Sequence, residues 1–323
     1  MKKLLIFPLM ITAGLLAYLL VFMLVVHRPL TIDEFGPYAA RTRAILAATA
    51  GPRIVIFAGS NGRFSHSCAQ ITADTGIACV NLSNAASISL KYQLDNYVDL
   101  LRAGDVVYLP LEYRSRAYFD PDGVGDEAQF LMYRDPRRML TLYNWRGLAK
   151  AAFGFSPRYL VTGLGEMALK RAGIGRRFSL GTLNAQGDES GHTAAKALPY
   201  RAYNMAWPRL TVDAGAYADH GYWHDVTVEL ARLHGRGVIV VGGLPTTFDD
   251  TIIPPNVVPF LQRLYADAGG CFIMLPNRSL YPRDHFYDAS YHLTENWQHA
   301  HSHALAPQLA QIFQAGRCPA ASR

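Results

Sequence analysis

Five short apolar segments that alternate with helical segments constrain the fold of this chain more than any other feature. They are rich in β-branched residues and have the length of buried strands, and they cover residues 53–60, 77–83, 105–113, 238–245 and 271–276. The segments between them, such as 87–104 and 256–270, carry apolar residues at helical spacing and end at glycine. Strands that are apolar on both faces and alternate with helices are typical of a parallel sheet covered by helices on both sides. The sequence therefore predicts an α/β fold.

Five such strands fit a flavodoxin-like three-layer α/β/α domain with a five-stranded parallel sheet, in which ligands bind at the carboxyl ends of the strands. We expect this domain to span residues 51–323, with an insertion at about 114–224 where the alternation stops. The insertion follows the carboxyl end of a strand, so it either overhangs the site as a lid or polymer-binding wall or is a structural elaboration without ligand contact. Its aromatic residues could stack on sugar rings or fill the core; they include Tyr200, Tyr203, Trp207, Tyr217, Tyr222 and Trp223.

Residues 4–26 form an uncharged apolar segment near the N-terminus. As a helix this segment would be about 35 Å long, enough to cross a hydrocarbon core of about 30 Å with a slight tilt, and it exceeds the apolar region of a cleaved signal peptide. Lys2 and Lys3 precede it, and the positive-inside rule places that end in the cytoplasm. We therefore expect residues 1–28 to be a single-pass transmembrane helix in the inner (cytoplasmic) membrane, residues 29–50 to be a linker, and the main domain to be periplasmic or extracellular.

Four cysteines suit an oxidising compartment in which disulfides persist; they are Cys68, Cys79, Cys271 and Cys318. Three connectivities are possible. We predict local pairing, Cys68 with Cys79 and Cys271 with Cys318, because each pair would tie neighbouring elements; four buried free thiols are the alternative. No C-x-x-C motif occurs, so a redox or zinc role is not expected.

The formal net charge of +6 is spread along the chain, with dense basic runs only at 134–138 and 175–177. A nucleic-acid-binding protein would carry a stronger basic patch, so no nucleic acid partner is expected. The two runs are either solvated surface or contacts to lipid headgroups or an anionic polymer. His299 and His303 are spaced to share a helical face, but no third ligand is evident nearby, so we expect an exposed face and no metal. No nucleotide-binding glycine pattern occurs, so no cofactor is expected.

Ser60 is the candidate nucleophile. It ends the first predicted strand, follows Gly59, which permits a tight turn, and opens a helix. A serine hydroxyl becomes nucleophilic only when a base takes its proton, and it must be exposed on a sharp turn; an ordinary helix N-cap is the alternative role for this residue. Asp288 and His292 lie on the loop after the last strand, which can reach the carboxyl end of the first strand. They fit an orienting carboxylate and a general base, whereas the alternative for His292 is a structural histidine.

These motifs resemble the SGNH or GDSL superfamily of esterases and acyltransferases. The resemblance rests on IVIFAGSN at 54–61, DVVYLPLEY at 105–113 and the D-x-x-x-H-L motif at 288–293. Within the superfamily the chain is most similar to membrane-anchored proteins that take part in cell-envelope or exopolysaccharide acylation, such as the teichoic-acid D-alanyl transfer proteins. The resemblance implies a catalytic serine at Ser60, a base at His292 and an orienting carboxylate at Asp288.

The chain departs from the family pattern at four places, the first of which is Gly59, where the family usually has an aspartate before the serine. Three residues separate Asp288 from His292 where the family has two, so Asp284 or a backbone carbonyl could replace Asp288. The oxyanion glycine is absent from 81–87, which leaves the Asn84 side chain, an amide near Ala85 or Ala86, and Asn61 as donors. Glu112 stands where the family has an oxyanion asparagine. An ionised carboxylate cannot donate a hydrogen bond, so Glu112 binds a substrate hydroxyl or an arginine, or is structural.

The expected function is an extracytoplasmic serine-dependent O-acyltransferase or esterase that acts on acyl groups, in the first place acetyl, of a cell-envelope or secreted polysaccharide. The expected partners are the polysaccharide, the membrane and a multi-pass membrane acyltransferase. The main alternative is a non-catalytic accessory protein that keeps the SGNH scaffold to bind glycan or to dock the multi-pass acyltransferase. A bystander esterase for small lipids is a third hypothesis.

Overall fold

The computed structural model describes most of the chain; the described residues are 2–22, 24, 35–85, 88–113, 126–154, 161, 164–165, 167–169, 171–172, 182–217 and 220–319. Ala86, the basic run at 175–177 and the side chain of Tyr222 lie outside this description. The chain divides into two compact units. Unit 1 comprises Met1–Pro37 with Asp120–Phe178, and unit 2 comprises Tyr38–Phe119 with Ser179–Arg323.

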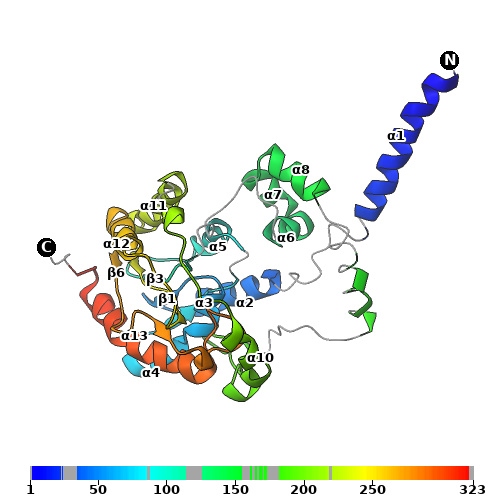
Figure 1. Ribbon diagram of the computed structural model, residues 1–323. Coiled ribbons are helices and arrows are strands. Elements are labelled where there is room, and N and C mark those ends of the chain that lie inside the picture. The colour runs from blue at the N-terminus through cyan, green and yellow to red at the C-terminus, as the bar shows by residue number, and fades with distance from the viewer. Residues whose placement is uncertain are drawn as a thin grey trace. The chain divides into compact units, whose positions relative to one another are not determined.

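Unit 2 is built on a five-stranded parallel sheet, in which Figure 1 labels β1, β3 and β6. The strand order is β2-β1-β3-β4-β6. The strands are β1 (Ile54–Ile56), β2 (Cys79–Asn81), β3 (Val106–Leu109), β4 (Ile239–Gly242) and β6 (Cys271–Phe272). All four pairings are parallel. The predicted α/β fold with a five-stranded parallel sheet is therefore confirmed.

The strands are apolar throughout because side chains on both faces of the sheet are buried. Val55, Val107 and Val240 point into one core cluster, whereas Ile54 and Val106, their chain neighbours, point into the other. The first cluster is covered by α5 (Leu90–Tyr97), α11 (His220–Gly235) and α12 (Val257–Asp267), and the second by α4 (Cys68–Thr75) and α13 (Glu295–Ala315). The three layers follow from this alternation.

Helix α2 (Phe35–Ala48) falls within the predicted linker. From Tyr38 onward it belongs to unit 2, and Tyr38, Thr42 and Leu46 are buried there. The Leu46 side chain is part of the first core cluster. The apolar spacing of this helix thus serves the core of the α/β domain.

Both disulfides join the cysteines that lie nearest in sequence. Cys68 is bonded to Cys79 with a Cα–Cα distance of 4.9 Å, and Cys271 to Cys318 with 5.6 Å. The first ties the start of α4 to β2, and the second ties β6 to the chain just beyond α13. The predicted local pairing is confirmed.

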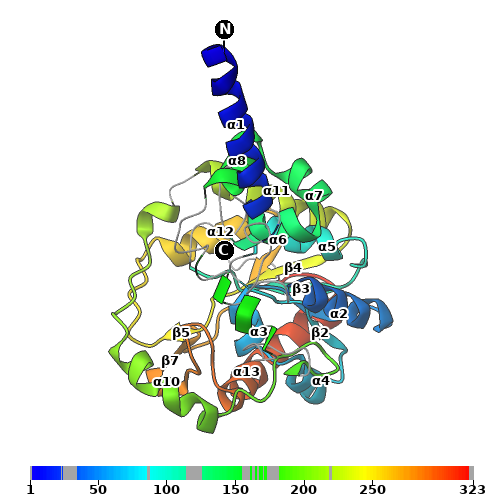
Figure 2. The same cartoon turned by 90° about the vertical axis from the view of Figure 1, so that its right-hand side faces the viewer.

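A second, two-stranded parallel sheet consists of β5 (Thr247–Phe248) and β7 (Leu280–Tyr281), and it lies beside α10 (Ala194–Ala206) (Figure 2). The 3-10 helix η4 (Arg283–His285) follows β7 and packs against α10. The sequence pattern did not predict this sheet, because two-residue strands carry no periodicity.

Unit 1 contains α1 (Lys2–Val21), α6 (Asp126–Arg134), α7 (Pro136–Leu142) and α8 (Trp145–Phe153). Asp135 and Asn144 cap the N-termini of α7 and α8 with their side chains. Among the residues that the structure describes, none of the helices combines the length and the apolar character needed to cross a membrane. The described side chains of the predicted membrane segment run from Ile6 to Phe22, with Leu24.

A chain of three buried polar side chains crosses the interior of unit 2. His66 Nε2 lies 3.2 Å from His301 Nε2, and His301 Nδ1 lies 2.9 Å from the Tyr281 hydroxyl. Burial lowers the pKa of His66 to about 4 and lowers the pKa of His301 well below its usual value; the neighbouring His66 lowers the latter further. Both imidazoles are therefore neutral in the folded protein near pH 7.

We expect the free energy of unfolding to fall as the pH decreases from about 6.5 toward about 4. In this window histidines of the unfolded chain bind protons, whereas the buried imidazoles of the folded chain stay neutral. Lowering the pH therefore favours unfolding, and the contribution of these histidines to stability is fully present above about pH 6.5. Urea unfolding at about pH 7.5 and about pH 5 measures the difference. His301→Gln should reduce this pH dependence, whereas His299→Gln, two residues away on the exposed face of α13, should leave it unchanged. Equal pH dependence in the His301 variant and the wild type would refute the assignment.

Candidate functional site

The predicted site residues lie at one edge of the sheet of unit 2. Ser60 follows β1, Asn84 follows β2, Glu112 follows β3 and His292 follows β6 along the chain. Because the strands are parallel, their carboxyl ends meet at the same edge, where α/β domains bind ligands.

Ser60 is the first residue of the short helix α3 (Ser60–Ser65) and is half-buried. The N-cap position belongs to Gly59, whose φ is −74°, and no side chain caps this helix. Ser60 therefore does not serve as a helix N-cap, which was the structural alternative for this residue. Its hydroxyl remains available for another role.

Glu112 holds the turn that presents Ser60. Its Oε1 accepts a hydrogen bond from the backbone amide of Asn61 at 3.1 Å. A Cβ atom at Gly59 would lie only 2.4 Å from the same oxygen, so the carboxyl group occupies the space that a side chain at position 59 would need. Burial raises the pKa of Glu112, whereas backbone hydrogen bonds, first that of Asn61, and the nearby His292 oppose the rise. Of the roles expected for Glu112, the structure shows the structural one: its carboxyl group is hydrogen-bonded to the backbone of the turn at Ser60.

Asp288 is hydrogen-bonded to His292. Its Oδ1 lies 2.6 Å from His292 Nδ1, and the two side chains are partly exposed, Asp288 at 20% and His292 at 14%. A tight turn brings them together: the Tyr287 amide donates to the His292 carbonyl at 2.7 Å, and the His292 amide donates to the Ala289 carbonyl at 3.1 Å. The extra residue between Asp288 and His292 is thereby accommodated, and Nε2 is left for a second partner. Asp284, the alternative orienting group, instead lies 3.8 Å from His285.

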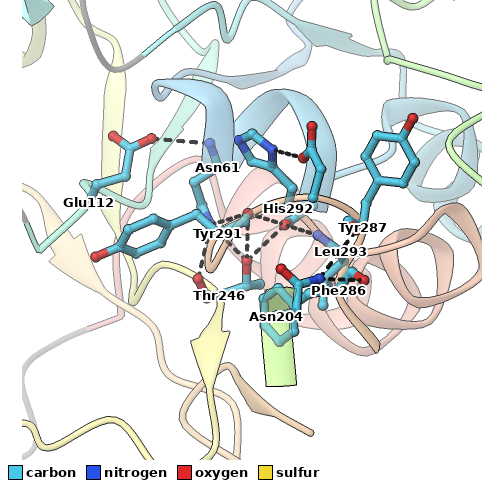
Figure 3. A network of polar contacts seen from close by, with 11 residues as sticks. Asn61, Glu112, Asn204, Thr246, Phe286, Tyr287, Tyr291, His292 and Leu293 are labelled. Atoms are coloured by element: carbon cyan, nitrogen blue, oxygen red, sulfur yellow. Dashed lines mark hydrogen bonds and ion pairs between the residues drawn. The ribbon is translucent and has the colours of Figure 1, made fainter. Parts of the chain in front are cut away.

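A network of hydroxyl and amide groups fastens α3 to the histidine loop (Figure 3). Ser65 Oγ donates to the Tyr291 carbonyl at 2.8 Å and accepts from the Leu293 amide at 3.2 Å. Thr246 Oγ1, from the loop after β4, donates to Ser65 Oγ at 2.7 Å. The Asn61 side-chain amide in turn donates to Thr246 Oγ1 at 2.7 Å. Asn61, predicted as an oxyanion donor, thus has its side chain directed into this network.

The ring of Phe64, on α3, stacks on the imidazole of His292 with a centroid distance of 4.3 Å and an interplanar angle of 20°. This contact places His292 against the helix that begins at Ser60. No direct hydrogen bond joins Ser60 to His292, both of which the structure describes. Such bonds are often long in the resting state and tighten when substrate binds.

Aromatic side chains extend from Phe64 beside His292. His192 packs edge-on to Phe64 at 5.4 Å and to Tyr287 at 5.9 Å, and Tyr200 of α10 packs edge-on to Tyr287 at 5.5 Å. Burial lowers the pKa of His192 to about 4, so its ring is neutral near pH 7. Sequence reasoning did not identify Phe64, His192 or Tyr287; only the position of Tyr287 directly before Asp288 could have pointed to it.

The aromatic residues predicted in the insertion separate into two groups. Tyr217 and Trp223 are buried, stack on each other at 5.2 Å and fill the first core cluster. Tyr200 contacts the aromatic group beside His292, whereas Tyr203 is exposed and packs edge-on to Trp207 at 4.8 Å. The core explanation therefore holds for the first pair, and among the described side chains of this set Tyr200 contacts the aromatic residues of the candidate site.

Asn84 lies next to the nucleophile turn. Its amide donates to the Ala58 carbonyl at 3.2 Å, two residues before Ser60. Its side chain is buried, and the side-chain oxygen has no hydrogen-bond partner within the described part of the chain. The backbone of Asn84 is thus hydrogen-bonded to the segment that leads from β1 to Ser60.

Among the described residues, no group of three or more His, Cys, Asp and Glu side chains is arranged to hold a metal ion. His303 lies 3.0 Å from Asp74, and His299 is exposed. The chain matches no protein-family model, and neither a curated protein nor a solved structure is significantly similar to it.

Proposed function

We propose that unit 2 is an SGNH-type serine esterase or acyltransferase in which Ser60 is the nucleophile, His292 the general base and Asp288 the orienting carboxylate. The observation that carries the proposal is the Asp288–His292 pair at 2.6 Å, stacked through Phe64 on the helix that starts at Ser60. A serine on the turn between a strand and a helix, and a carboxylate-oriented histidine on a neighbouring loop, are parts that acyl transfer requires.

In the proposed reaction, His292 Nε2 takes the proton of the Ser60 hydroxyl as Oγ attacks an ester carbonyl. The alcohol leaves with that proton, and an acyl-enzyme remains. Water or a sugar hydroxyl, deprotonated by His292, then attacks the acyl group and releases Ser60. Asp288 keeps Nδ1 protonated and stabilises the imidazolium that forms. Asn84 is the candidate donor to the oxyanion.

We propose acyl groups, acetyl foremost, on a cell-envelope or secreted polysaccharide as the substrate. Tyr287 and Tyr200 support a sugar because half-buried aromatic rings beside a reacting centre can offer stacking surfaces. We propose further that residues 4–26 anchor the chain in the inner membrane with unit 2 outside the cytoplasm. The uncharged sequence supports the anchor, and so does the exposure of its large apolar side chains, which include Phe7, Leu9, Met10 and Leu16.

A second candidate function is a non-catalytic accessory protein that binds glycan or docks a multi-pass membrane acyltransferase. Two donors near Ser60 favour it: the Asn61 backbone amide is bonded to Glu112, and the Asn61 side chain is bonded to Thr246. An oxyanion site built from these groups would need them free.

A fluorophosphonate probe separates the two functions, because it reacts only with an activated serine. We expect the purified full chain to become covalently labelled, and peptide mapping to place the label on Ser60 and not on Ser65, five residues later in the same helix. His292→Ala should abolish the labelling, whereas His303→Ala, an exposed histidine, should not. Absence of labelling in the folded wild type would favour the accessory function.

A further inference from the structure

Unit 1 exposes large apolar side chains beside basic ones. Leu140 on α7 is 67% exposed, and Trp145 and Phe153 on α8 are 73% and 63% exposed. Residues 136–153 contain four basic residues and no acidic one. Arg137 and Arg146 are exposed, and the Arg146 guanidinium lies 5.5 Å from the centre of the Trp145 ring. Exposed aromatic and aliphatic groups next to arginine are typical of helices that lie in a membrane interface.

The buried side of α8 explains why the large residues face outward. Gly147 and Ala151 are the residues of this helix that are buried. An ordinary surface helix would bury its large apolar residues and expose its small and polar ones. In α8 the large residues at both ends, Trp145 and Phe153, are exposed, which fits a partner surface that accepts apolar side chains.

The C-terminal end of α8 contacts the apolar helix α1. The Phe153 ring stacks on Tyr18 with a centroid distance of 5.1 Å, and the Tyr18 hydroxyl donates to the Ala152 carbonyl. Tyr18 lies in the last turn of α1 and in the outer half of the proposed anchor, residues 4–26, when the N-terminus is cytoplasmic. This contact places the C-terminal end of α8 against the outer half of the anchor.

We propose that α7 and α8 lie on the outer leaflet of the membrane, with Leu140, Trp145 and Phe153 inserted among anionic lipids and Arg137 and Arg146 on their headgroups. The inference rests on the proposed anchor and adds a second, charge-dependent membrane contact to it. Basic side chains near an anionic surface strengthen such binding, which makes the contact sensitive to lipid charge.

The test uses the full chain reconstituted into phosphatidylcholine vesicles with or without phosphatidylglycerol. All four native cysteines are in disulfides, so a cysteine introduced by Leu140→Cys can be labelled alone with the fluorophore NBD. Val228→Cys is the matched control, because Val228 is an apolar residue of unit 2 that is 51% exposed. We expect lipid-borne bromine or nitroxide to quench the label at position 140 several-fold more than at 228, and more strongly with phosphatidylglycerol present.

Charge reversal at Arg137→Glu and Arg146→Glu should remove most of the extra quenching at position 140. Equal quenching at 140 and 228 would overturn the proposal, as would a label at 140 that is shielded from water without lipid quenching, because protein then covers this face. Flotation of the chain with the vesicles tests the anchor separately. A chain that floats without quenching at 140 refutes only the lipid contact, and a chain that does not float refutes the anchor.

Discussion

Asp288→Asn is expected to lower acyl transfer by roughly 10³- to 10⁴-fold, the loss seen when the orienting carboxylate of a serine triad becomes an amide. The Asp288 carboxylate accepts a hydrogen bond from His292 Nδ1–H, with 2.6 Å between Oδ1 and Nδ1. An asparagine can turn its NH2 group toward Nδ1 and so favour the imidazole tautomer that carries the proton on Nε2. A protonated Nε2 cannot accept the proton of the serine hydroxyl. The measurement is kcat/KM for an activated acetyl ester, together with the rate of fluorophosphonate labelling.

Asp284→Asn is the matched control for this variant. Asp284 lies four residues earlier, is partly exposed and has His285 and Arg201 as neighbours at 3.8 and 3.9 Å. Its replacement should leave kcat/KM within about twofold of the wild type. The assignment fails if Asp288→Asn keeps the wild-type rate, or if Asp284→Asn loses as much activity. Similar unfolding midpoints for both variants would show that the comparison concerns catalysis.

The sheet could be predicted because buried parallel strands leave a strong trace in sequence. Residues 238–245 and 105–113 are nearly continuous apolar runs, and the glycines at 104 and 237 precede them with positive φ. The strands are shorter than the runs, however: β1 ends at Ile56 although the apolar run reaches Ala58. Phe57 and Ala58 are buried without being in the strand, because they carry the chain from the sheet to Ser60.

The structure of the insertion could not be predicted from the sequence. The polar loop at 182–192 looks like a solvated connection, yet Asp188, Glu189 and His192 are buried. Glu189 forms a buried ion pair with Arg63 of α3. A buried polar network and a solvated loop have the same composition, so only the fold separates them. The division of the insertion between the two units, at Phe178 and Ser179, leaves no pattern in the sequence either.

The proposed reacting residues of the site could be predicted from the sequence, whereas the residues that hold them in place could not. Ser60 and His292 belong to recognisable motifs at the ends of strands. The carboxyl group of Glu112 fills the space beside Gly59, and this relation exists only after β1 and β3 have paired. Phe64 reaches His292 for the same reason, across more than two hundred residues of chain. Contacts of this kind depend on tertiary structure and leave no local signal.

Asp188→Ala is expected to lower the free energy of unfolding of unit 2 by on the order of 3–5 kcal/mol. The buried carboxylate accepts hydrogen bonds from the backbone amides of Cys68 and Ala69, at 2.7 and 2.9 Å, which open α4. It also accepts from the side-chain amides of Asn184 and Asn81, at 2.9 and 3.3 Å. Alanine would leave the buried Cys68 amide without its acceptor and remove a negative charge from a helix N-terminus. Urea unfolding followed by circular dichroism measures the loss.

Asp74→Ala provides the comparison, because Asp74 is on the same helix and accepts hydrogen bonds from the side chains of Gln70 and His303 near the surface. Its loss should cost less than about 1 kcal/mol. Equal effects of the two substitutions would mean that the polar loop adds little to the stability of the domain. A large effect at Asp188 alone would show that the loop at 182–192 is part of the α/β domain, since the loop then holds the start of α4 and, through Asn81, the end of β2.

The buried Arg63–Glu189 pair joins the same loop to α3, so loosening the loop should also slow the labelling of Ser60.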